Sequence, residues 1–155
     1  MAAEIGQAAP DVTLMDTDRK QRSLSEWRGK NLVLAFMPGA FTGVCTTESC
    51  TFRDTSAQFN ALNAQVVGIT IDTPPSLKAW SEQNQFNFPV LSDWDRRAVK
   101  AYGVELPNWA DVPGYINTRR SVFIIDKDGV VRYKWITKAN EEPNYEELKQ
   151  ELAKL

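Results

Sequence analysis

Two cysteines, Cys45 and Cys50, are the residues of this sequence whose type and spacing point to chemistry. Cys45 follows the apolar run Asn31–Met37, which predicts a buried strand, and Pro38 ends that strand because proline has no N–H for a neighbouring strand. We therefore expect Cys45 in the first turn of a helix, where free backbone N–H groups and the helix dipole favour a thiolate. The thiolate is the nucleophilic form of cysteine, and a second thiol five residues on offers it a covalent partner. The pair predicts redox chemistry.

The alternative for Cys45 is a small apolar residue in the core, which is the commoner fate of a free cysteine. Thr42 and Thr46 lie beside it in the sequence, and Glu48 follows three residues later. A cysteine used only for packing does not need such polar neighbours at a helix start. We therefore interpret Cys45 as a reactive nucleophile.

Composition removes several other classes of function. The sequence contains no histidine, which excludes a Ser-His-Asp triad, a Cys-His protease and a histidine-ligated metal. Two cysteines are too few for a structural zinc site, and we expect no metal, flavin, haem or other cofactor. The net charge is −2 without a long basic run, so nucleic-acid binding has no support.

Length and hydropathy predict a cytoplasmic protein that makes no membrane contact. The longest apolar runs, such as Leu32–Met37, are too short to span a bilayer, and the first residues lack the pattern of a signal peptide. A chain of 155 residues with 43% hydrophobic and 25% charged residues is predicted to fold as one domain over residues 1–155. Two cysteines this close in a reducing compartment are more often redox-active than structural.

The apolar pattern predicts alternating strands and helices. Strands are expected at residues 11–15, 31–37, 65–72, 88–91, 121–125 and 130–135, and helices at 23–27, 44–62, 74–86, 95–102 and 145–155. The strand at 11–15 is predicted to lie at the edge of the sheet, and 44–62 to form one helix. Strands joined by helices run parallel, whereas the last two strands flank a tight turn and pair antiparallel. The result is an α/β protein with a thioredoxin-like fold, in which helices flank a central mixed β-sheet and Cys45 follows the carboxyl end of a strand.

The arrangement Pro38-x-x-x-Thr42-x-x-Cys45 resembles the active-site signature of the peroxiredoxins. Four further segments are similar to other conserved blocks of that family and occur in the family's order: Gly6–Leu14, Leu24–Leu34, Phe88–Asp93 and Arg120–Asp126. The resemblance covers nearly the whole chain. It implies a thiol-dependent peroxidase that reduces hydrogen peroxide or an organic hydroperoxide.

The resemblance also implies a role for each matching residue. Cys45 is then the peroxidatic cysteine, which attacks a peroxide oxygen and becomes a sulfenic acid. The Thr42 hydroxyl hydrogen-bonds and orients the peroxide, and Pro38 shields the thiolate from water and over-oxidation. Arg120 donates guanidinium hydrogen bonds that hold Cys45 as a thiolate and stabilise the leaving oxygen. Backbone N–H groups near Val44 complete the expected site.

Two arginines are adjacent, and the family pattern selects between them. The family's arginine lies three residues before the phenylalanine of Phe-Ile-Ile-Asp, here Phe123, which makes it Arg120. Strand alternation is then expected to send Arg119 to the opposite face. Glu48 is expected to support the site, either by capping the first helical turn or by pairing with Arg120.

Cys50 has two interpretations. Its spacing from Cys45 resembles the PrxQ branch, in which a second cysteine resolves the sulfenic acid as an intramolecular disulfide, and the chain equally resembles the one-cysteine AhpE type. Residues five apart on an intact helix have Cα atoms roughly 8–9 Å apart, whereas a disulfide needs them within about 7 Å. Resolution by Cys50 therefore predicts that the first helical turn unwinds. A buried packing residue unrelated to turnover is the alternative.

The favoured function is a peroxidase in which Cys50 resolves Cys45 and a thioredoxin-like or glutaredoxin-like reductant reduces the disulfide. The alternatives are a one-cysteine peroxidase resolved by an external thiol and a non-enzymatic redox sensor or binding module. The sequence leaves open whether the protein is a monomer or a homodimer. The segment 105–115 is longer than expected for the family and is predicted to be a surface loop packed by Trp109, or else to line the entrance for bulky hydroperoxides.

Overall fold

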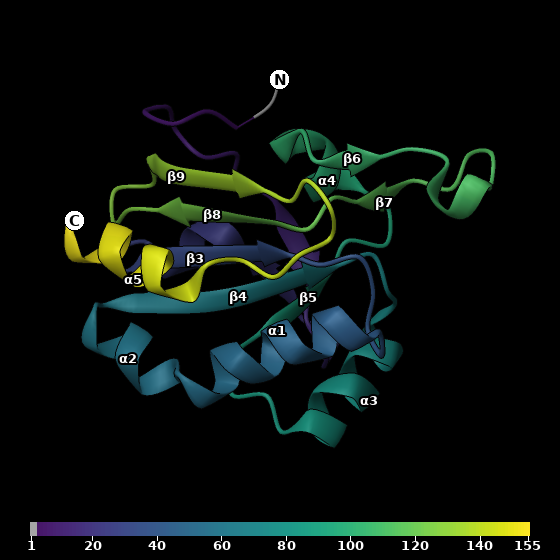
Figure 1. Ribbon diagram of the computed structural model, residues 1–155, viewed down its shortest axis with the longest axis horizontal. Coiled ribbons are helices and arrows are strands. Elements are labelled where there is room, and N and C mark those ends of the chain that lie inside the picture. Colours follow the sequence, from purple (N-terminus) through teal and green to yellow (C-terminus); the bar gives the residue numbers. More distant parts are fainter. Residues whose placement is uncertain (1–2) are drawn as a thin grey trace.

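A seven-stranded mixed β-sheet forms the centre of residues 3–155, the part of the chain that the computed structural model describes (Figure 1). The strand order is β2-β1-β5-β4-β3-β8-β9. Strands β3, β4 and β5 run parallel, and β8 and β9 add an antiparallel hairpin beside β3. The strands are β1 (Thr13–Met15), β2 (Gln21–Ser23), β3 (Asn31–Phe36), β4 (Ala64–Thr70), β5 (Val90–Ser92), β8 (Ser121–Ile125) and β9 (Val131–Ile136).

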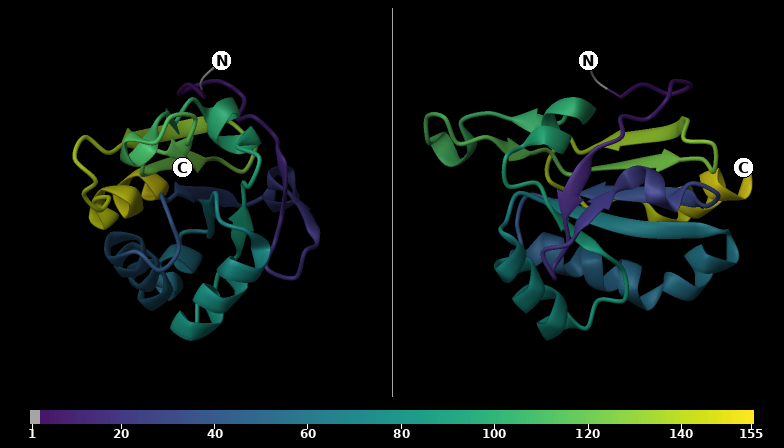
Figure 2. Two further views of the ribbon diagram at one scale, coloured as in Figure 1. Left: turned by 90° about the vertical axis from the view of Figure 1, so that its right-hand side faces the viewer. Right: turned by 180° about the vertical axis from the view of Figure 1, so that it is seen from behind.

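Helices cover both faces of the sheet (Figure 2). Helices α1, α2, α3 and α5 pack on one face, while α4 and the short 3-10 helix η1 pack on the other. The helices are η1 (Leu24–Trp27), α1 (Gly43–Asp54), α2 (Ser56–Ala61), α3 (Pro74–Asn84), α4 (Arg97–Tyr102), η2 (Trp109–Asp111) and α5 (Tyr145–Ala153). Within residues 3–155, no helix is long and apolar enough to cross a membrane.

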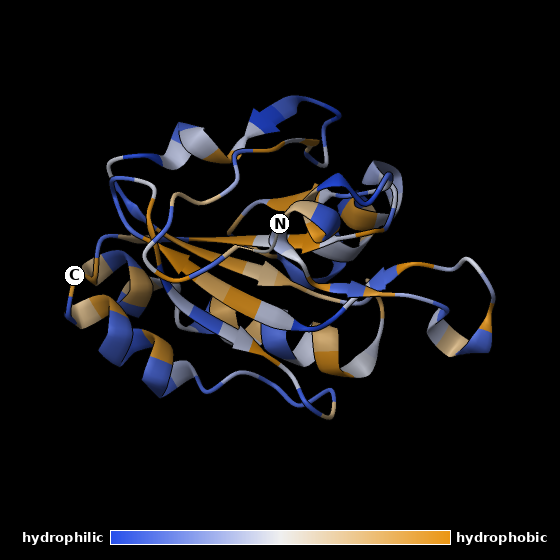
Figure 3. Cartoon of the chain, turned by 90° about the horizontal axis from the view of Figure 1, so that it is seen from above, coloured by the Kyte–Doolittle hydropathy of each residue, from blue (hydrophilic) through white to orange (hydrophobic). Residues whose placement is uncertain are grey.

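The continuous apolar run of β3 is explained by its central position, because a strand covered on both faces needs apolar side chains at every position. Successive side chains of a strand point to opposite faces. Leu34 and Phe36 accordingly join the core beneath α4, and Val33 and Ala35 join the core beneath α1 and α3. Figure 3 shows this hydrophobic character along the central strands. The α/β thioredoxin-like fold predicted from the sequence is confirmed.

Two local predictions are wrong. The strand at 11–15 is not at the edge, because β2 pairs with it antiparallel and forms the edge instead. The segment 44–62 is interrupted at Thr55, which separates α1 from α2. The Thr55 hydroxyl donates to the Thr51 carbonyl oxygen at 2.7 Å, and a β-branched residue with such a back-bond weakens a helix at that point.

The segment after α4 forms a projection that we call the arm (residues 105–118). Its base is the two-stranded ladder of β6 (Glu105–Leu106) with β7 (Asn117–Thr118), and its loop is closed by the rings of Trp109 and Tyr115, whose centroids lie 5.2 Å apart. The arm projects from the body of the molecule (Figure 2). The expected loop packed by Trp109 is therefore present, with strands at its base that the sequence did not predict.

Candidate active site

Cys45 lies in the first turn of α1, at the carboxyl end of β3, as the sequence predicts. Thr42 is the N-cap, and its carbonyl oxygen accepts a hydrogen bond from the Thr46 N–H at 3.0 Å. The N–H groups of Gly43, Val44 and Cys45 come before this bond and lie at the positive end of the helix dipole. The Cys45 side chain is fully buried, so an anion there depends on these dipoles and on neighbouring charge.

The loop between β3 and α1 is held by a carboxylate at the end of β4. Asp72 accepts hydrogen bonds from the Ala40 N–H at 2.8 Å and from the Thr70 hydroxyl at 2.7 Å. Phe41 follows in a left-handed backbone conformation with φ of 63° and exposes half of its side chain. These contacts fix the path of the chain into α1, and with it the place of Cys45.

Arg120 points at the Cys45 thiol from the position directly before β8. Its Nη2 donates to Cys45 Sγ at 3.2 Å, and its Nη1 donates to Glu48 Oε1 at 2.8 Å. Arg120 is only 2% exposed, so both bonds are made in a dry environment where charge interactions are strong. Arg119, in contrast, is exposed. The structure thus brings Cys45, Glu48 and Arg120 together and leaves Arg119 on the surface.

Glu48 pairs with Arg120, which decides between the two positions expected for it. Its carboxylate is fully buried, and Oε2 has no hydrogen-bond partner within residues 3–155. Burial raises the pKa of Glu48 to about 7, and the charge of Glu142 adds to this, while the ion pair with Arg120 opposes it. Glu48 is therefore a carboxyl group that changes charge near neutral pH. It is linked to the Cys45 thiol through one residue, Arg120, which donates hydrogen bonds to both.

Pro38 and Thr42 line a cavity of about 440 Å³ that reaches Arg120. The Thr42 hydroxyl donates to the Gly39 carbonyl oxygen at 2.7 Å, which leaves its oxygen lone pairs free to accept a hydrogen bond. Val44 contributes to the same wall. Cys45 itself is buried behind this wall, in contact with Arg120.

The arm forms the outer wall of this cavity. Leu106 and Trp109 line it from the arm, and Arg119 and Lys138 line it with positive charge. Trp109 therefore packs the arm and also borders the cavity, which combines the two interpretations of the segment 105–115.

Cys50 lies on the same intact helix as Cys45 but faces away from the cavity. Its Sγ contacts Asn84 Oδ1 of α3 at 3.9 Å, and the side chain is half-buried beside a shallow surface groove. Both thiols are free. Because α1 runs without interruption across both residues, a disulfide between them requires the helix to open.

Asn140 is a site residue that the sequence reasoning missed. Its Oδ1 accepts hydrogen bonds from Arg120 Nε at 3.2 Å and from Arg120 Nη2 at 3.0 Å. The register of the β8–β9 hairpin indicates that the loop that holds Asn140 lies near the site. Ser121 pairs with Ile136, so the chain that follows Ile136 must lie near Arg120. Nothing in the residue types of that loop selects Asn140 in particular.

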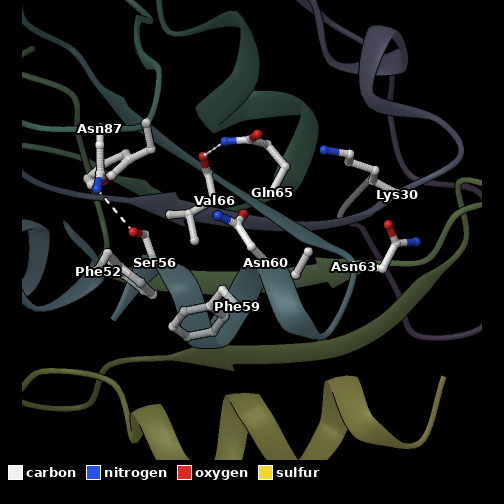
Figure 4. Close-up of a pocket in the computed structure, with 11 residues that line it drawn as sticks. Lys30, Phe52, Ser56, Phe59, Asn60, Asn63, Gln65, Val66 and Asn87 are labelled. Atoms are coloured by element: carbon white, nitrogen blue, oxygen red, sulfur yellow. Dashed lines mark hydrogen bonds between the residues drawn. The ribbon is translucent and has the colours of Figure 1, made fainter. Parts of the chain in front are cut away.

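A second hollow lies at the opposite end of the sheet, near the amino ends of β3 and β4 (Figure 4). Several of its polar side chains are engaged locally: Gln65 donates to the Val66 carbonyl oxygen at 2.8 Å, and Asn87 donates to the Ser56 hydroxyl at 3.0 Å. It contains no cysteine. The candidate chemistry is therefore at the Cys45 end.

The sheet and helices together define a protein of the thioredoxin-fold class, with a cysteine at the helix start after β3. The chain belongs to the AhpC/TSA family, which it matches over residues 5–134. It is 38% identical to alkyl hydroperoxide reductase E of Mycobacterium bovis, over 83% of this chain and 82% of the relative. It is 39% identical to the chloroplastic peroxiredoxin Q of Populus jackii, over 82% of this chain and 57% of the relative's length. The resemblance to peroxiredoxins of the PrxQ and AhpE types is confirmed.

Solved structures agree with this assignment. Peroxidoxin BcpB of Mycobacterium tuberculosis superposes with a TM-score of 0.89 at 27% identity, covering 99% of this chain and 98% of that one. A mutant of PrxQ from Xylella fastidiosa superposes with a TM-score of 0.87 at 27% identity, covering 98% of this chain and 96% of that one. The thioredoxin-like sheet of this chain is therefore the peroxiredoxin arrangement.

Proposed function

We propose that this protein is a thiol-dependent peroxidase that reduces hydrogen peroxide and organic hydroperoxides at Cys45. The observation that carries the proposal is the hydrogen bond from Arg120 Nη2 to Cys45 Sγ at 3.2 Å, inside a buried site at a helix start. A guanidinium and a helix N-terminus both favour a thiolate over a thiol. The matched relatives named as peroxiredoxin and hydroperoxide reductase support the same activity.

In the proposed first step, the Cys45 thiolate attacks the terminal oxygen of ROOH and the O–O bond breaks. Sulfur is oxidised to a sulfenic acid, Cys45–SOH, while RO⁻ leaves with the bonding electron pair and takes a proton to give ROH or water. Arg120, held between Cys45 and Glu48, is placed to stabilise the negative charge as it moves from sulfur to the leaving oxygen.

Thr42, Pro38 and the helix start are proposed to orient the peroxide. Because the Thr42 hydroxyl already donates to Gly39, its oxygen is suited to accept a hydrogen bond from the O–H of the hydroperoxide. The N–H of Val44, in the first turn of α1, is proposed to donate to a peroxide oxygen. Pro38 forms an apolar part of the cavity wall and limits the access of water to the thiolate.

The proposed second step is resolution by Cys50. Its thiol condenses with Cys45–SOH, a disulfide forms and water leaves. A thioredoxin-like or glutaredoxin-like dithiol then reduces the disulfide by exchange and becomes a disulfide itself. Resolution by Cys50 requires the first turn of α1 to unwind, because in the folded helix the Cys50 thiol contacts Asn84 of α3. If the helix stays intact, the alternative applies and an external thiol attacks Cys45–SOH directly.

Stopped-flow fluorescence with intact mass tests both steps. Pre-reduced protein is mixed with one equivalent of peroxide, for the wild type, Cys50→Ser and Cys45→Ser. The expected result is a fast phase that ends about two mass units lower in the wild type and about sixteen higher in Cys50→Ser. Cys45→Ser is the control and should show no fast phase. The absence of a fast phase in the wild type refutes the peroxidase and favours a redox sensor or binding module.

Amide hydrogen exchange tests the unwinding. The first turn of α1 is expected to exchange faster in the oxidised wild type than in the reduced protein, with no such change in Cys50→Ser. Equal exchange in both states, together with an unresolved sulfenic acid, points to the external thiol. Cytoplasmic location stays a prediction of the sequence, and the sequence leaves the choice between monomer and homodimer open.

A further inference from the structure

The guanidinium of Arg120 has more contacts than the peroxidase scheme uses. Its planar fork carries five N–H donors in a side chain only 2% exposed, and four of them have acceptors within residues 3–155. Nη1 bonds Glu48, and Nη2 bonds Cys45. The edge made by Nε and Nη2 bonds a single oxygen, Asn140 Oδ1, at 3.2 and 3.0 Å. Asn140 thus accepts from one whole edge of the fork.

This edge contact determines where the second N–H of Nη2 points. Glu48 bonds only Nη1, and a guanidinium group held at Nη1 alone can still rotate about that contact. The bifurcated contact with Asn140 holds a second position on the plane. With two positions fixed, the second N–H of Nη2 is directed at Cys45 Sγ. The thiol contact therefore depends on Asn140 as well as on Glu48.

Asn140 is itself placed by the β9–α5 loop (residues 137–144). The Glu141 carboxylate accepts hydrogen bonds from the N–H groups of Lys138 at 3.1 Å and Ala139 at 2.9 Å, and the Glu141 N–H donates to the Thr137 hydroxyl at 3.1 Å. These bonds close a tight turn in which Asn140 takes a left-handed conformation with φ of 57°. Asparagine tolerates this conformation better than most residues.

The loop is also tied to the backbone of Arg120. The Thr137 N–H donates to the Arg120 carbonyl oxygen at 2.9 Å, directly after the β8–β9 pairing ends. The turn that carries Asn140 and the residue that Asn140 contacts are therefore one connected unit. None of these bonds uses the Asn140 side chain, so the turn can persist when that side chain is changed.

We propose that Asn140 is a positioning residue, which holds the Arg120 guanidinium against Cys45 and couples the β9–α5 loop to the reactivity of the thiol. The proposal rests on the proposed function of Cys45 as a nucleophile. A neutral amide suits this role, because it satisfies the buried donors and leaves the positive charge of Arg120 for the thiolate. A carboxylate in its place would compete with the thiolate for that charge.

Asn140→Gly and Asn140→Asp test the proposal in the full chain with Cys50→Ser. Glycine removes the acceptor but keeps the left-handed conformation, so the turn is not strained. Aspartate keeps the acceptor and adds a charge. The matched control is Asn63→Gly, because Asn63 is also exposed with φ of 55° but lies at the far end of the sheet. The readouts are the pH profile of Cys45 alkylation by iodoacetamide and the rate constant with hydrogen peroxide.

We expect the midpoint of the alkylation profile to rise by about one pH unit in both Asn140 variants, with a roughly tenfold slower peroxide reaction near neutral pH. Asn63→Gly should leave both unchanged. An unchanged midpoint in Asn140→Gly overturns the proposal, whatever happens to stability and whatever the added charge does in Asn140→Asp. If the wild type does not react with peroxide but the midpoints still shift, the proposed function falls and the positioning role stands.

Discussion

Replacing Glu48 with glutamine is expected to remove a pH dependence from the stability of this protein. The Glu48 carboxyl is fully buried and shares Arg120 with Cys45. Burial raises its pKa to about 7, with a smaller contribution from Glu142, although Arg120 acts in the opposite direction. In the unfolded chain the same carboxyl has its ordinary pKa of 4.5.

The sign follows from proton linkage. Between pH 4.5 and pH 7 the folded protein keeps the Glu48 proton that the unfolded chain releases, so folding becomes less favourable as the pH rises. At about 1.4 kcal/mol for each pH unit, this change amounts to about 3 kcal/mol across the interval. Above about pH 7 Glu48 is charged in both the folded and the unfolded state, so its effect on the free energy of unfolding no longer changes with pH. Glutamine does not titrate, so its effect on the Arg120 contact is a constant offset.

Urea unfolding of Cys45→Ser and of Cys45→Ser with Glu48→Gln, at half-unit steps from pH 4.5 to pH 8, measures this difference. The serine removes the thiol that shares Arg120 with Glu48, so that Glu48 is the group compared. The stability of the glutamine protein relative to its parent should rise by about 3 kcal/mol with increasing pH. A constant difference, or one that falls as the pH rises, would show that the Arg120 pair outweighs burial and refute the reasoning.

Three further substitutions have defined outcomes. Arg120→Lys should slow the reaction of Cys45 with peroxide about a hundredfold, because an ammonium cannot reproduce the fork; an unchanged stopped-flow rate would contradict this. Asp93→Ala should lower the free energy of unfolding by about 2 kcal/mol, because its buried carboxylate accepts from two N–H groups of α4; equal urea midpoints would contradict this. Trp80→Phe should abolish most of the oxidation-linked fluorescence change, because the Trp80 indole donates to Thr46 in the turn expected to unwind, and a full remaining signal would place the change elsewhere.

Much of the fold could be predicted because its signals are local. The run Leu32–Phe36 is apolar at every position and identifies a doubly covered strand, and the turn after Ile125 identifies the antiparallel hairpin. The edge strand β2 was not predicted, since its three residues carry no apolar pattern and pair only because β1 lies beside them. The break at Thr55 was also missed, because one threonine in a long helical pattern is a weak signal against the pattern as a whole.

The place of Cys45 at a helix start was determined by the sequence itself, since a strand, a proline and a helical pattern succeed one another within a few residues. The arrangement around the thiol was decided only by the tertiary structure. Arg120 reaches Cys45 from 75 positions away, and Asn140 reaches Arg120 from the loop that follows the neighbouring hairpin strand. Chain-local patterns report backbone conformation and burial, whereas the direction of a guanidinium depends on contacts between segments that folding alone brings together.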